Sequence, residues 1–452
     1  MIALISFLFI LVISFIYGVY FSDPMLGNTL VIHYLLGGVI INALVRKNFT
    51  NLTKWYSLFF ILYSIYLFFV QIGLNKFYGN NDEVLFFASS KDAINYGWDK
   101  IVKITFYKGF YSEYPAAMLL WSAITKLGHE IGVENLRLYS RFHLLIMGSG
   151  IMAILCSYME ALNYDKRRTI IYALVFGLCT YIVYLTCNYT RDLHCMFFMT
   201  IIGYKVMTSS NITVLCELLL LSFILVFFRK ENGLFAFLFI GAWIYMNGYV
   251  SKKTVAIFGV FCFLLAVSTI LLVYSQSSEW TDSHTGSGLF TQINSLPIYL
   301  KPIAYTLFML FQPFPFYNMM GDGHSGGLLA LPMMFLPVII MYVFWILYKS
   351  YRIDKNRDFF LFFIFVGYFI LVSFLAPVYR RVFLIMPSAF LLFLKRQDLV
   401  DRWIKLKALK YILMFWGVVN IMYILFDLLR NNSSLKFEIM AKQLYVASQR
   451  VL

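Results

Sequence analysis

Long apolar runs, many of them close to the length of a helix that crosses a bilayer, make up most of this chain. A helix needs about 20 mostly apolar residues to cross the hydrocarbon core. On this criterion we count about 13 predicted spans, at residues 2–20, 29–45, 55–75, 139–162, 169–187, 194–209, 212–228, 234–249, 254–274, 327–348, 359–376, 382–394 and 409–427. The chain is therefore predicted to be an all-α, polytopic integral membrane protein.

Composition agrees with this prediction and argues against separate soluble domains. Hydrophobic residues make up 61% of the chain and charged residues only 13%, whereas soluble domains carry about 25% charged residues. No long polar stretch could form a soluble unit, so residues 1–452 are predicted to be one membrane-embedded domain. The net charge of +15 comes mostly from short loops between apolar runs. This pattern reports orientation in a membrane, and no nucleic-acid partner is expected.

Five loops contain 18 of the 37 basic residues, and the predicted spans place all five on one side of the membrane. Excess Lys and Arg mark the cytoplasmic side. The agreement requires that 297–317 does not cross fully. Because that stretch contains four prolines, which break helices, it is predicted to be re-entrant or to lie on the outer surface. The two large extracytoplasmic segments are then 76–138 and 275–326.

The first of these segments is long for a connection, and long loops are usually functional. Residues 84–93 are amphipathic at helical spacing, and the apolar run from Ala116 to Gly128 is too short to span. We expect two or three helices that lie along the outer leaflet and cover a cavity between the spans.

An adjacent pair of carboxylates, Asp82 and Glu83, opens this segment directly after an apolar span. Ionisable residues at a membrane edge are functional candidates. A carboxylate near a low-dielectric surface has a raised pKa and can act as a general base. Asp82 could instead stabilise the start of a helix, and Glu83 could be a solvated loop residue.

Further polar residues are predicted to lie at the same outer rim, where basic residues oppose the positive-inside bias. Arginine provides a planar, always-charged fork suited to phosphate oxygens. An anionic ligand would explain these positions, although Arg191-Asp192 could be a local ion pair and Arg380-Arg381 an interfacial anchor. The predicted substrate- and phosphate-binding residues are Tyr114, Arg191, Asp192, Arg229, Lys230, Tyr379, Arg380 and Arg381.

The order of these motifs resembles that of the GT-C membrane glycosyltransferases, in the group that contains protein O-mannosyltransferases and the aminoarabinose transferases that modify lipid A. The similar features are the acidic pair in Asp82-Glu83-Val84-Leu85-Phe86-Phe87-Ala88, the proline-led helix from Tyr114-Pro115 to Leu127-Gly128, the arginines Arg137 and Arg141, the corner Arg229-Lys230-Glu231-Asn232-Gly233, and Tyr379-Arg380-Arg381 before Pro387. The resemblance covers about residues 75–395, and it implies a GT-C-like arrangement with Asp82 as the base.

The chain departs from this group in two ways: two apolar spans precede the span of the acidic loop, and only a short segment follows the last span. The predicted activity is inverting transfer of a sugar or oligosaccharide from a polyprenyl phosphate or diphosphate carrier to an envelope glycan or lipid acceptor. Asp82 would deprotonate the acceptor, and Glu83 would orient it or bind a divalent ion, so metal use stays open. The expected location is the bacterial inner membrane, with the site facing the periplasm. The alternatives are a repeat-unit polymerase of the Wzy type and a flippase for lipid-linked saccharides.

Overall fold

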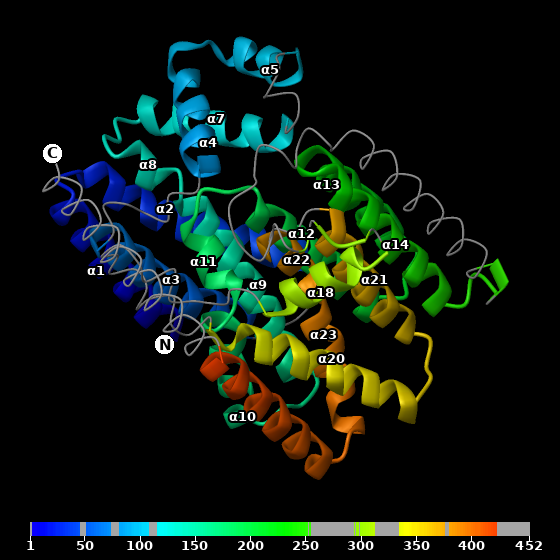
Figure 1. Cartoon of the computed structure of the whole chain (residues 1–452). Helices are drawn as coiled ribbons and strands as arrows, with labels where there is room; N and C mark the ends of the chain where they lie inside the picture. Colours follow the sequence, from blue (N-terminus) through cyan, green and yellow to red (C-terminus); the bar gives the residue numbers. More distant parts are fainter. Residues whose placement is uncertain are drawn as a thin grey trace, which may run out of the picture.

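The structure is a computed structural model of the full chain, and it describes residues 2–45, 51–73, 81–107, 115–251, 253–254, 293, 295–297, 299–311, 334–375 and 379–422. Within these residues every regular element is a helix, as predicted (Figure 1). The expected span at 254–274 lies almost wholly outside the described residues, as does most of 275–326.

The first half of the molecule is built around one central helix, α9 (Phe142–Ala161). Helices α2 (Pro24–Val45) and α3 (Leu52–Gly73) pack beside it, and α1 (Ile2–Tyr20) packs on α2 and α3. The first three apolar runs are therefore helical, as predicted. Glycine allows the close approach of neighbouring helices: Gly148 faces Thr186, and Gly150 faces Ile41. Nearly every residue of α9 is buried as a result.

Several of these helices are suited to a bilayer. In the described part of the chain, four helices are long and apolar enough to cross a membrane: Pro24–Val45, Leu52–Phe69, Leu136–Ala161 and Leu336–Ile353. A fifth crossing is possible if one bent helix pair forms a single span. These apolar helices indicate a membrane-embedded protein, while the number of 13 spans stays a prediction.

The bent pair corrects the prediction of one continuous span at 169–187. Helix α10 (Lys166–Leu178) and helix α11 (Tyr181–Cys187) meet at 51°. The carbonyl oxygens freed at the break find other donors, as unpaired groups in an apolar environment must. The Thr180 hydroxyl donates to the carbonyl of Phe176, and the Tyr63 hydroxyl donates to the carbonyl of Gly177.

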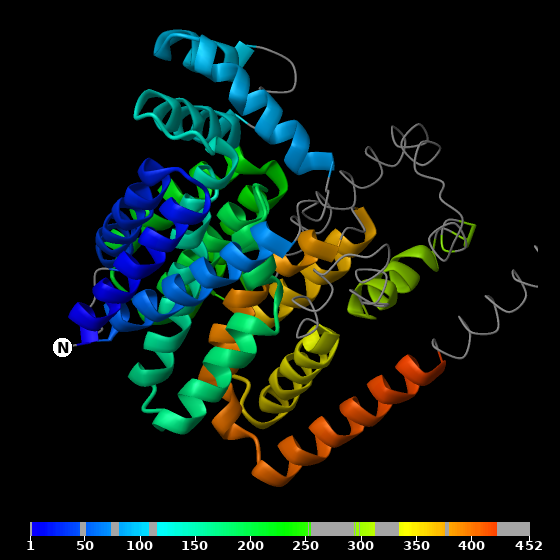
Figure 2. The same cartoon turned by 90° about the vertical axis from the view of Figure 1, so that its left-hand side faces the viewer.

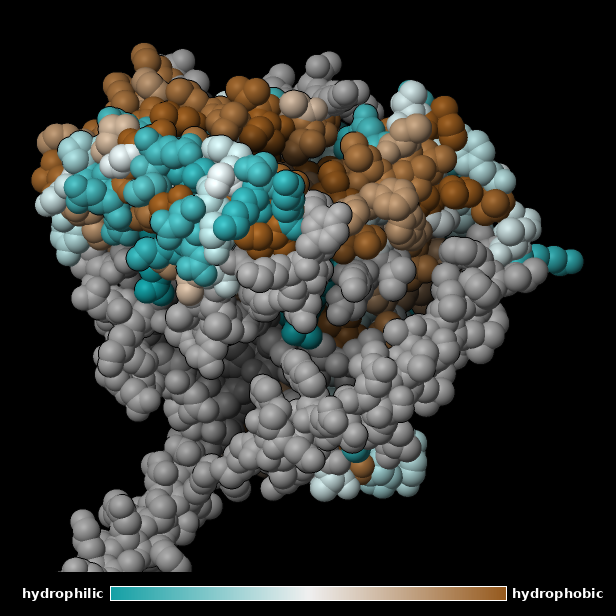
Figure 3. Space-filling view, turned by 90° about the horizontal axis from the view of Figure 1, so that it is seen from above, coloured by the Kyte–Doolittle hydropathy of each residue, from teal (hydrophilic) through white to brown (hydrophobic). Residues whose placement is uncertain are grey.

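Short helices lie across one end of this bundle and form what we call the cap (Figures 1 and 2). They are α4 (Asn81–Asp92), η1 (Ala93–Asn95), α5 (Trp98–Tyr107), α7 (Pro115–Glu130) and α8 (Leu136–Tyr139). The predicted helices near 84–93 and after Pro115 are therefore confirmed. Seen from the cap side, hydrophilic side chains gather over part of this face, and hydrophobic residues lie beside them (Figure 3).

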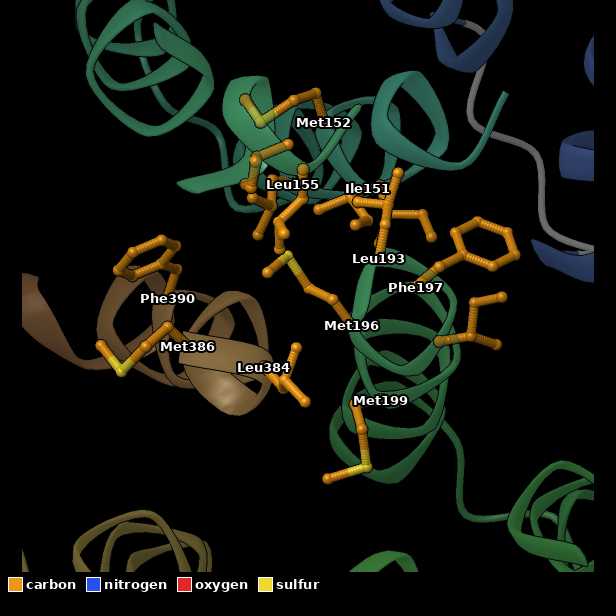
Figure 4. Close-up of a cluster of buried hydrophobic side chains, with 14 of the residues drawn as sticks. Ile151, Met152, Leu155, Leu193, Met196, Phe197, Met199, Leu384, Met386 and Phe390 are labelled. Carbon is orange, nitrogen blue, oxygen red and sulfur yellow. The ribbon is translucent and has the colours of Figure 1, made fainter. Parts of the chain in front are cut away.

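Helices of the second half pack on the other side of α9. They are α12 (Asp192–Thr208), α13 (Thr213–Phe228), α14 (Lys230–Met246), α18 (Lys301–Phe311), α20 (Leu336–Ile353), α21 (Phe359–Leu375), α22 (Tyr379–Val382), η5 (Phe383–Ile385), α23 (Met386–Arg396), η6 (Gln397–Leu399) and a helix over 402–422. Side chains of α9, α12 and α23, including Leu155, Met196 and Phe390, point toward one another and form the apolar centre (Figure 4).

Two boundaries in this half differ from the prediction. The span predicted at 327–348 is helical up to Ile353, since Lys349 and Arg352 continue the helix instead of forming a loop. The span predicted at 409–427 begins as a helix already at residue 402. Asp401 explains this earlier start, because its carboxylate accepts a hydrogen bond from the backbone N–H of Trp403 at 2.6 Å.

Three of the five basic loops, at 166–168, 349–357 and 395–410, meet at the end of the bundle opposite the cap, which we call the basic end. Tyr164 donates to the carbonyl of Leu394 at 2.7 Å, and Arg168 pairs with Asp398 at 2.9 Å. At the cap end, by contrast, the Asp23 carboxylate between α1 and α2 accepts from the backbone N–H of Asn135 at 3.0 Å. These contacts place the loop at Asp23 at the cap end, and the number and order of the spans stay a prediction.

Candidate functional site

Asp82 and Glu83 lie in the first turn of α4, and the positions of their side chains are outside what the structure describes. Asp82 precedes Phe86 by about one helical turn, and the Phe86 ring packs on Trp121 of α7 with centroids 4.7 Å apart. Acidic residues in a first turn also stabilise the helix through its dipole. The position is therefore compatible with both readings of Asp82.

Directly beneath the cap, residues 188–195 form a stretch with several buried polar side chains. Asn188, Tyr189 and Thr190 link α11 to α12, and Arg191 and Asp192 begin α12. All five side chains are buried. The predicted pair Arg191-Asp192 thus lies inside the protein, below the cap, and not on an exposed rim.

Asp192 forms an ion pair with Arg229, which lies 37 residues farther along the chain. The Arg229 Nη1 lies 2.7 Å from the Asp192 Oδ1, and each side chain is 5% exposed. Arg229 stands at the sharp corner between α13 and α14, where Gly233 lies against the backbone of Val226. Two corners that were predicted separately as phosphate-binding are therefore in direct contact.

The third predicted corner joins them through Tyr368 of α21. Its hydroxyl lies 3.1 Å from the Asn232 Oδ1 and 3.0 Å from the carbonyl oxygen of Arg381. Asn232 lies three residues after Arg229, so the corners at 191–192, 229–232 and 381 are linked by contacts. Three other predicted residues lie at helix starts: Lys230 at α14, and Tyr379 and Arg380 at α22. The structure does not describe their side chains, and Tyr114 lies outside the described residues.

A pair of buried histidines, which sequence reasoning missed, lies in the same region. The Nε2 atoms of His143 in α9 and His194 in α12 are 3.1 Å apart. His194 also stacks on Phe228, with ring centroids 5.1 Å apart, and meets the edge of Trp121 at 5.9 Å. One sequence pattern could have indicated both histidines. Each is an ionisable residue in the first turn of an apolar run, shortly after an arginine at the start of that run.

Hydroxyl groups from two cap helices, from the end of α8 and from the connection between α11 and α12 form a small network between the cap and this stretch. Thr125 lies 3.3 Å from Ser90 and 3.1 Å from Ser140, and the Tyr189 hydroxyl lies 3.4 Å from Ser90. We call the whole set the polar layer, and its members are Ser90, Trp121, Thr125, Ser140, Arg141, His143, Asn188, Tyr189, Thr190, Arg191, Asp192, His194, Arg229, Asn232, Tyr368 and Arg381.

Several buried atoms of the polar layer have no hydrogen-bond partner among the described protein atoms. They are the Trp121 Nε1, the Asn188 Oδ1, the Thr190 Oγ1 and the Asn232 Nδ2. Each such group costs about 1–3 kcal/mol when left unpaired, so it calls for a water molecule or a ligand as partner. The layer as we define it contains three arginines with buried side chains, Arg141, Arg191 and Arg229, and a single carboxylate, and this balance favours an anion.

A metal centre is not evident within the described ranges, where no three His, Cys, Asp or Glu side chains gather closely enough to hold an ion. The side chain of Glu83 is not described, and His324 lies outside the described residues, so neither is tested as a metal ligand. A scan against protein-family models, a search of curated proteins and a search of solved structures each found no match to this chain.

Proposed function

We propose that the protein is a membrane glycosyltransferase that moves a sugar or oligosaccharide from a polyprenyl-phosphate or diphosphate carrier to an envelope acceptor at the cap end. One observation carries the proposal: three arginine-bearing corners, far apart in the sequence, are linked through Asp192–Arg229 and Tyr368 inside an apolar bundle. They lie beneath a cap whose first helix begins with Asp82 and Glu83.

This arrangement provides what the transfer reaction requires. The bond between the sugar C1 and the carrier phosphate oxygen breaks, and the phosphate leaves with the electron pair. A bond then joins C1 to the acceptor oxygen, and the acceptor proton passes to a carboxylate, for which Asp82 is the candidate. Prearranged cations stabilise the negative charge that develops on the leaving phosphate, and the arginines of the polar layer are suited to this task.

The unpartnered polar atoms of the layer also support a sugar as the ligand. An indole N–H, an amide carbonyl, a hydroxyl and an amide N–H from Trp121, Asn188, Thr190 and Asn232 offer both donors and acceptors. Sugar hydroxyls need both. The surrounding apolar helices would accommodate a polyprenyl tail in the bilayer.

A reconstituted assay tests the proposal. The purified protein in lipid vesicles, supplied with a short-chain polyprenyl-phosphate sugar and an extracted envelope acceptor fraction, is expected to transfer the labelled sugar to the acceptor. Asp82→Asn should lower this transfer at least 100-fold, since general-base catalysis contributes about 10²–10⁴.

Asp99→Asn is the matched control, because Asp99 is an exposed carboxylate on cap helix α5, where it pairs loosely with Lys103 at 3.8 Å. It should keep full activity. Equal activity of the Asp82→Asn and unsubstituted proteins would remove Asp82 as the base. If the intact lipid-linked sugar instead crosses the vesicle membrane without transfer to the acceptor, the protein is a flippase and not a glycosyltransferase.

A further inference from the structure

The helix over 402–422, at the basic end, has one strongly exposed half whose chemistry changes along its length. Residues 402, 403, 406, 407, 410, 411, 414, 418 and 421 share this half and are all exposed, whereas Ala408 and Trp416 on the opposite half are buried. The helix extends away from the central bundle (Figure 2). Its exposed half therefore meets the surroundings of the protein.

The first part of the exposed half is basic and aromatic. Trp403 is 67% exposed and Tyr411 is 58% exposed. The Lys407 ammonium lies between them, 4.8 Å from the Trp403 ring centroid and 5.9 Å from that of Tyr411. Trp and Tyr beside Lys are typical of the level at which a membrane protein meets lipid headgroups.

Beyond Tyr411 the helix is exposed and apolar on most of its surface. Leu413, Met414, Phe415, Val418, Ile421 and Met422 are all exposed. This part extends about 17 Å at 1.5 Å per residue. Such a surface suits acyl chains, so residues 402–411 mark the level of the headgroups.

Three cations at this level lack an intramolecular counter-charge among the described residues. Lys405 lies 3.7 Å from Asp398, which also pairs with Arg168, and Arg396 pairs with Asp354 and Asp358. By contrast, no described carboxylate lies within 4.0 Å of Arg402, Lys407 or Lys410. Lys405 thus joins the start of the helix to η6, and the other three cations of the helix are exposed.

Helix α20, at the same end, repeats the pattern. Its exposed Trp345 and Tyr348 accompany Lys349, whose ammonium lies 5.2 Å from the Trp345 ring centroid. Figures 1 and 2 show α20 beside the helix over 402–422. Two neighbouring helices thus present basic and aromatic side chains at one level, in agreement with a common membrane surface.

We propose that Arg402, Lys407 and Lys410 bind the phosphodiester headgroup of an anionic membrane phospholipid at the basic end, with Trp403 and Tyr411 beside its glycerol and the apolar part of the helix along its acyl chains. We choose an anionic lipid because of charge complementarity: three outward cations lie at the level of the headgroups, next to an apolar surface. A zwitterionic lipid carries no net charge to match them.

Electron paramagnetic resonance of spin-labelled lipids tests this proposal. The protein is reconstituted in phosphatidylcholine membranes, and the association of spin-labelled phosphatidylglycerol is measured relative to spin-labelled phosphatidylcholine. Lys407→Gln should reduce the preference for phosphatidylglycerol up to about fivefold, and the triple replacement Arg402→Gln, Lys407→Gln, Lys410→Gln should reduce it further. Raised salt should weaken the preference of the unsubstituted protein.

Replacement of Lys91, Lys100 and Lys103 by Gln is the matched control. These lysines are exposed on the cap, so their replacement removes the same amount of charge at the opposite end of the protein. It should leave the preference unchanged. An equal loss in both triple variants would overturn the proposal, because net charge alone would explain the preference. No loss in either variant would overturn it as well. Displacement of the lipid by millimolar inorganic phosphate would show a free-anion site instead. Sugar-transfer activity plays no part in this readout.

Discussion

Arg229 and Asp192 form an ion pair that joins the start of α14 to the first turn of α12, with 2.7 Å between Nη1 and Oδ1 and both side chains almost completely buried. Removal of one member of a buried pair leaves an uncompensated charge in a low-dielectric environment. This loss is usually much larger than the net contribution of the pair itself.

We therefore expect Asp192→Ala to lower the free energy of unfolding by about 3–5 kcal/mol. The double variant Asp192→Ala, Arg229→Met should be more stable than Asp192→Ala, because it removes both charges. Unfolding in mixed micelles with increasing SDS measures both. A double variant less stable than Asp192→Ala would contradict this account.

The histidine pair should behave in a similar way with a smaller magnitude. His143→Phe leaves the His194 Nε2 without the partner that lies 3.1 Å away, and an unpaired buried group costs about 1–3 kcal/mol. The double variant His143→Phe, His194→Phe should recover part of this loss. Thermal unfolding in detergent, followed by light scattering, would show the order of the melting temperatures.

Gly233 is expected to tolerate no side chain. A Cβ at this position would overlap the backbone of Val226, which cannot move without separating α13 from α14. Gly233→Ala should lower the unfolding free energy by about 1–3 kcal/mol. Gly367→Ala in α21 is the control: a Cβ there meets no described atom within 4 Å, so this change should be neutral or stabilising.

Arg396 holds the basic end together. It is buried, it lies 2.7 Å from the Asp354 carboxylate, and it also pairs with the buried Asp358. Arg396→Ala should lower the unfolding free energy by about 3–5 kcal/mol. Lys166→Ala, at an exposed position of the same end, should change it by less than about 0.5 kcal/mol. Similar losses in both variants would assign the effect to overall charge.

Cysteine labelling tests the orientation of the two ends. In a cysteine-free background, Ala88→Cys on the exposed side of α4 should react with a membrane-impermeant maleimide in intact cells. Lys166→Cys at the basic end should react only after permeabilisation, because basic loops face the cytoplasm. Labelling of Lys166→Cys in intact cells would place the cap in the cytoplasm and exclude the proposed reaction site.

Much of the fold follows from local sequence patterns. The apolar runs predicted α1, α2, α3, α9, α12, α13 and α21 within a few residues, and the amphipathic spacing after Asp82 and the proline at 115 predicted the main cap helices. The break at Thr180 was not predictable, because the Tyr63 hydroxyl that satisfies a carbonyl there belongs to another helix. Hydrophobic periodicity contains no information about such a distant donor.

The sequence by itself determined that this chain is helical and apolar, that it carries an acidic pair at the start of a capping segment, and that many of its basic residues cluster in short loops between apolar runs. These properties depend on residue types and on spacings within one helix. Only the tertiary structure decided that Asp192 pairs with Arg229, that Tyr368 reaches Asn232 and the Arg381 carbonyl, and that His143 meets His194. The reason is physical: a side chain's partner is set by the way in which distant helices pack, and in an apolar interior a polar group is stable only where that packing brings another polar group to it.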